Sequence, residues 1–404
     1  MMKILQIIAA FFIGVIAHAQ SLDDYVAIAL KNNSNIKVNK AKYRLEKTKI
    51  DEVATYENTI FNAGIFALTP ETRVGSQLFK IGVAQKLPWF GELEAKRNLQ
   101  LEKSELRQYD IALSQKEIVF KVKKAYYQIY RQEAITGILK ENKLILKTYE
   151  NMALAALENN RATMSDVLRI RVQKNELHSK IFQNLNSLDI LKQNFNNLLE
   201  RDLNLPLNVK DSLNVLDILV GNTSVKQHPI LLKLKNTKAV YQAEEKVIQK
   251  SEKPKISVGL DYILVNKRTD SNPLQNGKDI VMPKVSLSIP VFNKKKYQSK
   301  HQQVKIKEAL LFDYIQANKT NLQIALNQAK LDLDNAILTV VAAQKNKNEI
   351  QRAINVDLKA YETGILDYDK ILRLQLQKIR FQLKEIEATE KAYIAKSKID
   401  YLTE

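Results

Sequence analysis

The sequence predicts a mostly helical protein with a small β part, in which one unit of short strands and very long helices occurs twice. Glycine (10) and proline (8) are scarce among the 404 residues, and 45% of the residues are hydrophobic. Few helix breakers over so long a chain favour long, uninterrupted elements, and the remaining residue mix favours helices. Similar segments also return at a constant spacing along the chain, which indicates an internal duplication.

The duplication is clearest where residues 157–174 match residues 361–378, at an offset of 204 positions. A second match lies upstream, between residues 80–90 and 284–292. In each of these, alternating residues end in a proline and an aromatic residue before a long helical stretch. The matched order of elements argues against chance similarity. We therefore divide the chain into a signal peptide (1–19), a first repeat (20–200), a linker (201–225) and a second repeat (226–404).

The N-terminus has the pattern of a secretory signal peptide. Lys3 precedes an apolar run at residues 4–16, and residues 17–19 form the small-x-small sequence Ala-His-Ala, which predicts cleavage before Gln20. The run is shorter than the roughly 20 residues that a membrane-spanning helix needs. The chain has no cysteine, which excludes a lipid anchor on a mature cysteine and any thiolate site. We expect an exported, non-lipidated chain.

Each repeat predicts the same succession of a helix, two strands, a very long helix and a return helix. In the first repeat these elements are expected at residues 21–56 (broken near 32–34), 59–68, 77–87, 92–158 and 163–200. In the second repeat they are expected at residues 228–251, 255–265, 281–289, 294–362 and 366–404. Ser21 suits the N-cap of the first helix, with Asp23 and Asp24 in its first turn.

The strands alternate between apolar and small or polar residues. Along residues 255–265, Val258, Leu260 and Tyr262 share one face, while Gly259 and Asp261 share the other. This period of two fits a barrel strand with a lipid face and a wet face, and it also fits a half-buried strand of a soluble protein. Four strands cannot close a conducting barrel, and open edges are not tolerated in lipid. A membrane location would therefore require other copies of the chain.

The long helices carry seven-residue stripes. Roughly 66 residues at ~1.5 Å per residue make a helix of ~100 Å. The stripes are Leu99, Leu106, Leu113, Phe120, Tyr127 and Ala134; Ile111, Ile118 and Ala125; and Ile315, Leu322, Ala329, Ala336 and Ala343. Such stripes are typical of coiled-coil packing, and two stripes on one helix indicate neighbours on both sides.

Charge and composition give little support to an enzyme or a nucleic-acid-binding protein. The net charge of +19 comes from lysines spread along the helical segments, without a nucleic-acid-binding motif. His178, His228 and His301 lack the spacing of a metal site or a catalytic triad. We expect no enzyme activity, no catalytic residues, no metal, no cofactor and no nucleic-acid partner.

Residues 85–97, which include Pro88-Trp89-Phe90-Gly91, resemble the strand-to-helix junction of TolC-family outer-membrane efflux proteins. Residues 361–372 resemble the second helical tip of that family. The resemblance covers nearly the whole mature chain and implies a homotrimer with a twelve-stranded outer-membrane barrel and a helical periplasmic tunnel. It also implies a periplasmic adaptor and an inner-membrane pump of the RND type as partners, with the chain as a passive exit duct.

Several other functions are also compatible with the sequence. The junction sequence also resembles the heavy-metal efflux branch of the family. The same duct could serve type I protein secretion. A soluble periplasmic coiled-coil scaffold and an extracytoplasmic hydrolase are the alternatives from other classes, and the strand alternation argues against the scaffold.

Three groups of candidate site residues follow. Proline ends a strand ladder, glycine permits the turn into the helix, and the aromatic residues suit a membrane–water interface. The junction residues are Pro88, Trp89, Phe90, Gly91, Pro290 and Phe292. The helical tips, to which the resemblance assigns adaptor docking, are Asn159, Asn160, Arg161, Thr363, Gly364 and Ile365.

The third group is a candidate gate just beyond the tips: Asp166, Arg169, Asp367, Asp369, Lys370 and Arg373. Where the family resemblance leads us to expect carboxylates, this sequence has Lys370 and Arg373. We hypothesise a basic or mixed-charge ring, since a ring of one sign sets an electrostatic barrier in a pore. The alternative is that these charges pair between helices.

Overall fold

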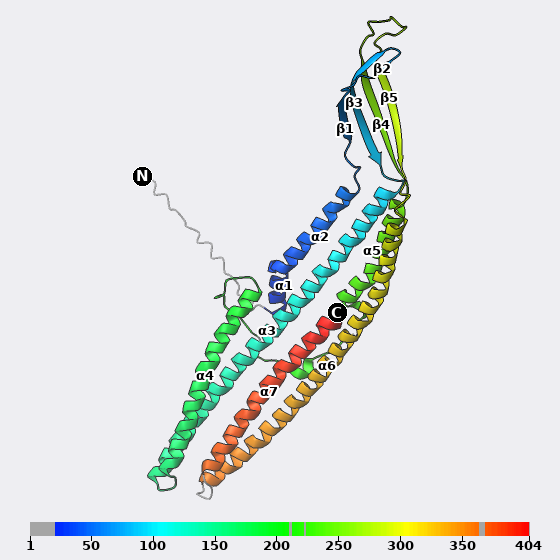
Figure 1. Ribbon diagram of the computed structural model, residues 1–404. Helices are drawn as coiled ribbons and strands as arrows, with labels where there is room; N and C mark the ends of the chain where they lie inside the picture. Colours follow the sequence, from blue (N-terminus) through cyan, green and yellow to red (C-terminus); the bar gives the residue numbers. More distant parts are fainter. Residues whose placement is uncertain (1–20, 210–211, 222–223, 363–367, 404) are drawn as a thin grey trace, which may run out of the picture. The chain divides into compact units, whose positions relative to one another are not determined.

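The computed structural model describes residues 21–403, except 210–211, 222–223 and 363–367 (Figure 1). The chain forms two compact units. The tip unit contains the described residues up to Ser34, those of 115–225 and those from 323 onward; the sheet unit contains residues 35–114 and 226–322. Each unit takes residues from both predicted repeats. The predicted boundaries at 19, 200 and 225 stay predictions.

The elements follow one another in the predicted order. The helices are α1 (Leu22–Asn32), α2 (Ser34–Val53), α3 (Glu92–Glu158), α4 (Met164–Leu198), α5 (Pro229–Ser251), α6 (Lys294–Glu362) and α7 (Tyr368–Thr403). The strands are β1 (Ile60–Ile65), β2 (Glu71–Thr72), β3 (Gly75–Leu87), β4 (Lys255–Val265) and β5 (Ile280–Ser288). Two short 3-10 helices, Val215–Asp217 and Val225–Gln227, lie in and at the end of the predicted linker. The predicted fold class, mostly helical with four long strands per chain, is confirmed.

Local signals explain where the helices begin. Ser21 caps α1 through a capping box with Asp24, as the sequence predicts. His228 caps α5, where its Nδ1 accepts a hydrogen bond from the Ile230 N–H at 3.3 Å, and Pro229 follows at the first helical position. The described ranges contain no helix that is both long enough and apolar enough to cross a membrane.

The first strand is shorter than predicted. It ends at Ile65 rather than at Leu68, because the chain turns at Pro70 into the two-residue strand β2, which pairs with the start of β3. The sequence prediction missed β2 and began β3 two residues late. A strand of two residues is too short to show a period-two pattern.

The sheet is antiparallel throughout, with the order β1-β3-β4-β5 and β2 attached to β3. Ile81 of β3 pairs with Tyr262 of β4, and Tyr262 pairs with Val281 of β5. Directly paired residues point to the same side of a sheet, so this register fixes which residues share a face. β1 and β5 are the edge strands, and each pairs with a single strand along this order.

The core of the tip unit joins four helices. Leu146 and Ala153 of α3, Ile170 of α4 and Ile371 of α7 are fully buried in one cluster, and Leu358 of α6 packs against it. The predicted α6 stripe is partly confirmed, since Ala329, Ala336 and Ala343 are buried. Figure 1 shows α3 with α4, and α6 with α7, as pairs of neighbouring helices in this unit.

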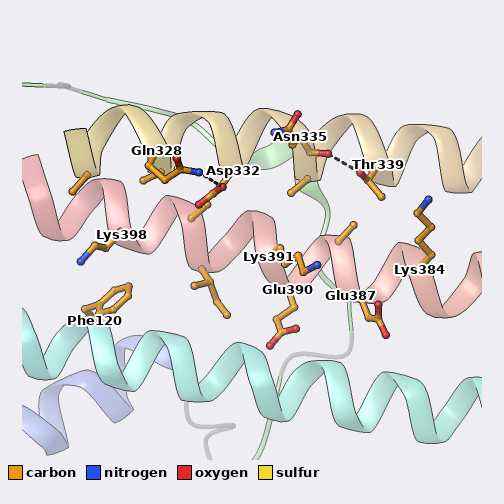
Figure 2. Close-up of a pocket in the computed structure, with 16 residues that line it drawn as sticks. Phe120, Gln328, Asp332, Asn335, Thr339, Lys384, Glu387, Glu390, Lys391 and Lys398 are labelled. Carbon is orange, nitrogen blue, oxygen red and sulfur yellow. Dashed lines mark hydrogen bonds between the residues drawn. The ribbon is translucent and has the colours of Figure 1, made fainter. Parts of the chain in front are cut away.

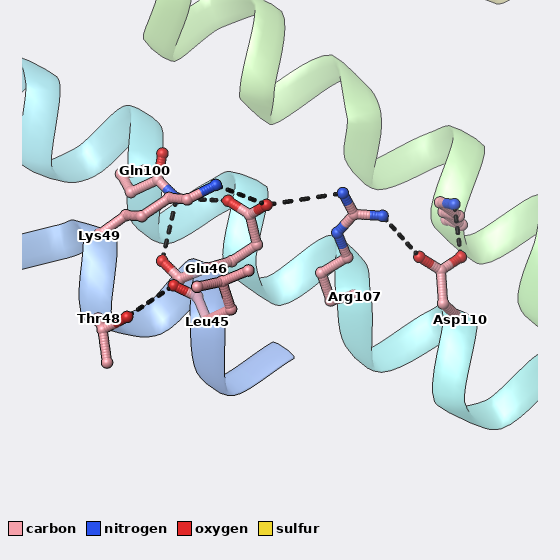
Figure 3. A network of polar contacts seen from close by, with 8 residues as sticks. Leu45, Glu46, Thr48, Lys49, Gln100, Arg107 and Asp110 are labelled. Carbon is pink, nitrogen blue, oxygen red and sulfur yellow. Dashed lines mark hydrogen bonds and ion pairs between the residues drawn. The ribbon is translucent and has the colours of Figure 1, made fainter. Parts of the chain in front are cut away.

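In the sheet unit, a polar network ties α2, α3 and α5 together (Figure 3). The carboxylate of Glu46 on α2 accepts a hydrogen bond from Gln100 Nε2 of α3 at 2.7 Å and lies 3.6 Å from Arg107. Asp110, one turn further along α3, contacts Arg107 at 3.3 Å and Lys233 of α5 at 2.6 Å. The hydrogen bond from Gln100, with help from Lys49 and Arg107, holds the pKa of Glu46 below its ordinary value.

Candidate functional site

One face of the sheet is apolar and exposed. Within the chain, Phe61, Ile65 and Val285 are about four-fifths exposed, at 80%, 81% and 78%. The register places these residues on the same face as the following large apolar side chains: Ile81, Val258, Leu260, Tyr262, Leu264, Val281 and Leu287. A continuous exposed apolar face of this kind marks contact with another apolar phase, either a partner or lipid.

The opposite face carries every charged residue of the four long strands. These are Lys80, Lys86, Lys255, Lys284 and Asp261. Asp261 is fully buried and lies 2.5 Å from the ammonium groups of both Lys80 and Lys284. All the charges of these four strands therefore lie on one side of the sheet, together with a few aliphatic residues such as Ile60 and Ile263, while the other side carries no charge.

Gly82 makes room for this arrangement. A Cβ atom at Gly82 would lie 2.3 Å from Asp261 Oδ1 and 2.3 Å from Asn62 Oδ1. Such contacts are too short for a carbon atom. The Asp261 carboxylate can therefore lie against β3 at this point only because residue 82 is a glycine, which has no Cβ atom. The period-two pattern in the sequence placed Asp261 on the polar face but gave no sign of its two lysine partners.

The first junction turns sharply into α3. Gly91 has φ +78, in the left-handed region that glycine tolerates, and the Glu92 N–H donates to the Trp89 carbonyl at 2.9 Å. The rings of Trp89 and Phe90 pack edge to face at 5.8 Å, and Phe90 is 77% exposed. The turn thus follows the mechanical prediction for Pro88 and Gly91, and it presents an aromatic pair beside the sheet.

The second junction lacks the glycine but keeps the aromatic residue. The Asn293 N–H donates to the Pro290 carbonyl at 3.2 Å, and α6 begins at the next residue. Phe292 is almost fully exposed, at 98%. Both strand-to-helix junctions therefore present an exposed phenylalanine.

The first tip is a tight helix stop followed by a helix start. Asn160 has φ 54, its N–H donates to the Leu157 carbonyl at 3.0 Å, and the Arg161 N–H donates to the Ala156 carbonyl at 2.8 Å. This is a Schellman motif, with asparagine in the left-handed position. Asn159 adds a side-chain bond to the Ala155 carbonyl. At the second tip, Thr363, Gly364 and Ile365 lie outside the described residues, as does the gate candidate Asp367.

Asp166 closes the capping box of α4. Its carboxylate accepts hydrogen bonds from the Thr163 hydroxyl at 2.6 Å and from the Thr163 N–H at 2.9 Å, while its own N–H donates to the Thr163 hydroxyl. This role in the capping box is enough to explain a carboxylate at position 166, whether or not the residue also belongs to a gate. The assignment of Asp166 to a gate stays a prediction.

The other described gate candidates form ion pairs, two of which join different helices and one of which lies within α7. Arg169 of α4 and Arg373 of α7 both contact Asp369, at 3.3 Å and 2.7 Å. Lys370 contacts Asp357 of α6 at 3.5 Å. The two arginines occupy matched positions of the predicted repeats and meet on one carboxylate.

In these pairs the cations are exposed and the carboxylates are not. The side chains of Arg169, Lys370 and Arg373 are 57%, 57% and 72% exposed, against 18% for Asp369 and 11% for Asp357. A solute near this surface would therefore meet ammonium and guanidinium groups first. The sequence interpretation missed Asp357, which sits 13 positions before its partner on another helix.

A second ion cluster lies on the α3–α4 pair. Glu150 contacts Arg171 at 2.6 Å and also forms an ion pair with Lys174. The hydrogen bonds from Lys174 and then Arg171 hold the pKa of Glu150 below its ordinary value of 4.5. No spacing in the sequence links Glu150 to residues on the next helix, so this cluster could not be predicted.

A groove of about 910 Å³ runs between α6 and α7 (Figure 2). Alanines such as Ala329 and Ala336 line it together with Phe120 of α3, and charged side chains such as Lys384 and Glu387 project along its length. The described parts of the chain contain no cluster of three histidine, cysteine or acidic residues that could hold a metal ion.

Known structures share this arrangement of sheet and helices. CusC, studied for folding and transmembrane channel formation, matches with a TM-score of 0.76 at 14% identity, over 95% of this chain and 92% of its own. The chain has the fold of a TolC-type outer-membrane channel. The outer membrane protein VceC of Vibrio cholerae matches with a TM-score of 0.74 at 9% identity, over 94% of this chain and 95% of its own.

The open-state outer membrane channel MtrE of Neisseria gonorrhoeae also matches, with a TM-score of 0.74 at 12% identity, over 95% of this chain and 88% of its own. No protein-family model and no curated protein sequence matches the chain. At these identities the likeness establishes the fold. The fold implied by the junction sequence is thereby confirmed.

Proposed function

We propose that this protein is the outer-membrane channel of a tripartite efflux system. It would work as a passive exit duct, coupled to a periplasmic adaptor and an inner-membrane pump of the RND type. The observation that carries the proposal is the two-faced sheet, apolar and exposed on one side and charged on the other. That division suits a wall between lipid and water. The fold shared with outer-membrane channels supports it.

The edges of the sheet support a homo-oligomer. Lipid offers no hydrogen-bonding partner to the free edges of β1 and β5. Neighbouring copies can pair with both edges, and three copies would supply twelve strands, the number that the family resemblance implies. We therefore propose a homotrimer whose barrel lies in the outer membrane.

An exposed stripe on α6 supports the same conclusion. Ile324, Leu331 and Leu338 recur every seven residues and are 62%, 57% and 67% exposed within the chain. The buried stripe of Ala329 and Ala336 faces the chain's own helices. A helix with one covered and one uncovered stripe suits a wall of helices that continues into the next copy.

The finer assignments rest partly on the family resemblance and partly on the residues themselves. The described tip residues Asn159, Asn160 and Arg161 are proposed to dock the adaptor, and Trp89, Phe90 and Phe292 to lie at the membrane interface. The proposal that the protein belongs to the heavy-metal efflux branch rests on the sequence of residues 85–97 alone. On that proposal, a metal ion is one candidate substrate. We propose export by the N-terminal signal, without lipidation.

Membrane fractionation with unboiled gel electrophoresis tests the proposal. We expect the protein to stay in the outer-membrane fraction after washes with salt and carbonate, and to migrate as a heat-sensitive oligomer. A protein that washes off the membrane and runs as a monomer without boiling would instead indicate a soluble periplasmic scaffold.

A further inference from the structure

The polar face of the sheet carries an excess of positive charge. The four long strands contain four lysines and one aspartate, all on this face, so their fixed charges sum to +3. At one end of the sheet, Lys86 and Lys255 share Glu57, at 3.8 Å and 3.9 Å. In mid-sheet, Lys80 and Lys284 share Asp261, which leaves a net charge of +1.

The exposure of these mid-sheet groups is asymmetric. The Asp261 side chain is 0% exposed, whereas those of Lys80 and Lys284 are 32% and 34% exposed. Asp261 lies close over Gly82, where no side chain intervenes, and is covered by its two partners. The carboxylate therefore holds the lysines in place, while the ammonium groups face the open side of the sheet.

We propose that this face makes the channel select anions, with Lys80 and Lys284 as the specificity-determining residues and Asp261 as a positioning residue. The inference rests on the proposed function, since it requires the polar face to line a water-filled pore. Each copy adds another mid-sheet charge of +1, and rings of one charge sign set the electrostatic barrier of a pore. A lumen with low-dielectric walls focuses such a field.

The substrate class that fits is a solute with net negative charge, such as an organic acid, an acidic drug or an anionic metal complex. A bare hydrated divalent metal ion would be disfavoured. The exposed cations Arg169, Lys370 and Arg373 in the first turns of α4 and α7 are also positive, so the test must separate their effect on selectivity from that of the sheet lysines.

Reversal potentials in planar bilayers under a tenfold KCl gradient test the proposal. We expect the wild-type channel to pass chloride in preference to potassium. The triple variant Lys80→Gln/Asp261→Asn/Lys284→Gln removes all three charges but keeps hydrogen-bonding groups, so it leaves no unpaired buried charge. It should lower the chloride-to-potassium permeability ratio by about twofold or more. The charge-preserving control Lys80→Arg/Lys284→Arg should retain the wild-type ratio.

The salt dependence of the wild-type channel gives a second test that needs no variant. Fixed charges are screened over ~30 Å at 0.01 M salt and ~3 Å at 1 M, so the chloride preference should shrink as KCl is raised. A conducting oligomer that prefers potassium, or a triple variant with the wild-type ratio, would overturn the inference and leave the proposed function standing. Absence of any oligomer or conductance would instead overturn the proposed function.

Discussion

Arg169 of α4 lies 3.3 Å from Asp369 of α7, although the two residues are 200 positions apart in the chain. Arg373 reaches the same carboxylate from one turn further along α7. Asp369 thus connects the return helix of the first predicted repeat to that of the second. Any movement that separates α4 from α7 at this level must break the contact between Arg169 and Asp369.

Substitution of Asp369 by asparagine should loosen this connection with little loss of stability. Exposed ion pairs contribute about 0–1 kcal/mol, and both arginines are more than half exposed. We expect Asp369→Asn to raise the open-channel fraction or the conductance in bilayer recordings, with a thermal midpoint close to the wild type. The control is Glu349→Gln, which breaks the exposed pair with Arg352 within α6. Equal conductance in Asp369→Asn, the control and the wild type would count against a gate at this position.

Reversal of the tip cations should change ion selectivity. Lys370→Asp and Arg373→Asp each replace an exposed cation with a carboxylate, beside Asp357 and Asp369 respectively. Each should shift the permeability ratio toward cations, because the sign of the fixed charge at the surface is inverted. Reversal potentials measured as for the sheet variants provide the check. Unchanged ion selectivity in both variants would contradict the hypothesis of a charged ring at the tips.

Asp166 is expected to affect stability rather than selectivity. Loss of a capping residue costs about 0.5–2 kcal/mol, so Thr163→Ala and Asp166→Ala should each destabilise the start of α4 by about 1 kcal/mol. Limited proteolysis around residues 159–166 and thermal unfolding followed by circular dichroism measure this effect. A change of selectivity in Asp166→Ala that is absent from Thr163→Ala would support the assignment of Asp166 to the gate.

The Glu150 cluster predicts an acid-sensitive contribution to stability. The pKa of Glu150 is lower in the folded protein than its ordinary value of 4.5. The stabilisation is therefore present above that value and is lost as the pH falls through the lower pKa of the folded state. Between pH 6 and pH 3.5, the thermal midpoint of the wild type should fall further than that of Glu150→Gln. Parallel curves for the two proteins would exclude this contribution.

The two faces of the sheet predict opposite responses to the same change. Arginine on a lipid-facing strand residue costs about 2–4 kcal/mol near the membrane centre, whereas lumen positions tolerate charge. Val285 belongs to the apolar face, and its neighbour Ser286 to the polar face. We expect Val285→Arg to reduce the amount of assembled protein in the outer membrane, and Ser286→Arg to leave it near the wild-type level. The reverse order of effects would mean that the faces are assigned the wrong way round.

Local signals predicted most of the fold. Proline and glycine at the junction set the start of α3 at Glu92, and the alternation of apolar residues set β4 at Lys255–Val265. The sequence analysis did not predict the strand β2, because a strand of two residues is too short to show an alternating pattern.

The candidate sites were predicted less well, because their partners are far apart in the chain. Arg169 was identified as a charged residue near the tip, but its contact with Asp369 depends on the packing of α4 against α7. The same holds for Lys80 and Lys284, which meet at Asp261 only through the strand register. The capping box of Thr163 and Asp166 is a local pattern that the sequence analysis did not identify, although it accounts for the carboxylate of one predicted gate residue.

The most direct test of the account is the behaviour of the purified mature chain in detergent and in lipid. The account predicts that light scattering in detergent gives the mass of three copies, and that planar bilayers show discrete conductance steps, which disappear in Val285→Arg. A monomer that stays soluble without detergent and conducts no ions would contradict the claim that these sheets assemble into a membrane pore.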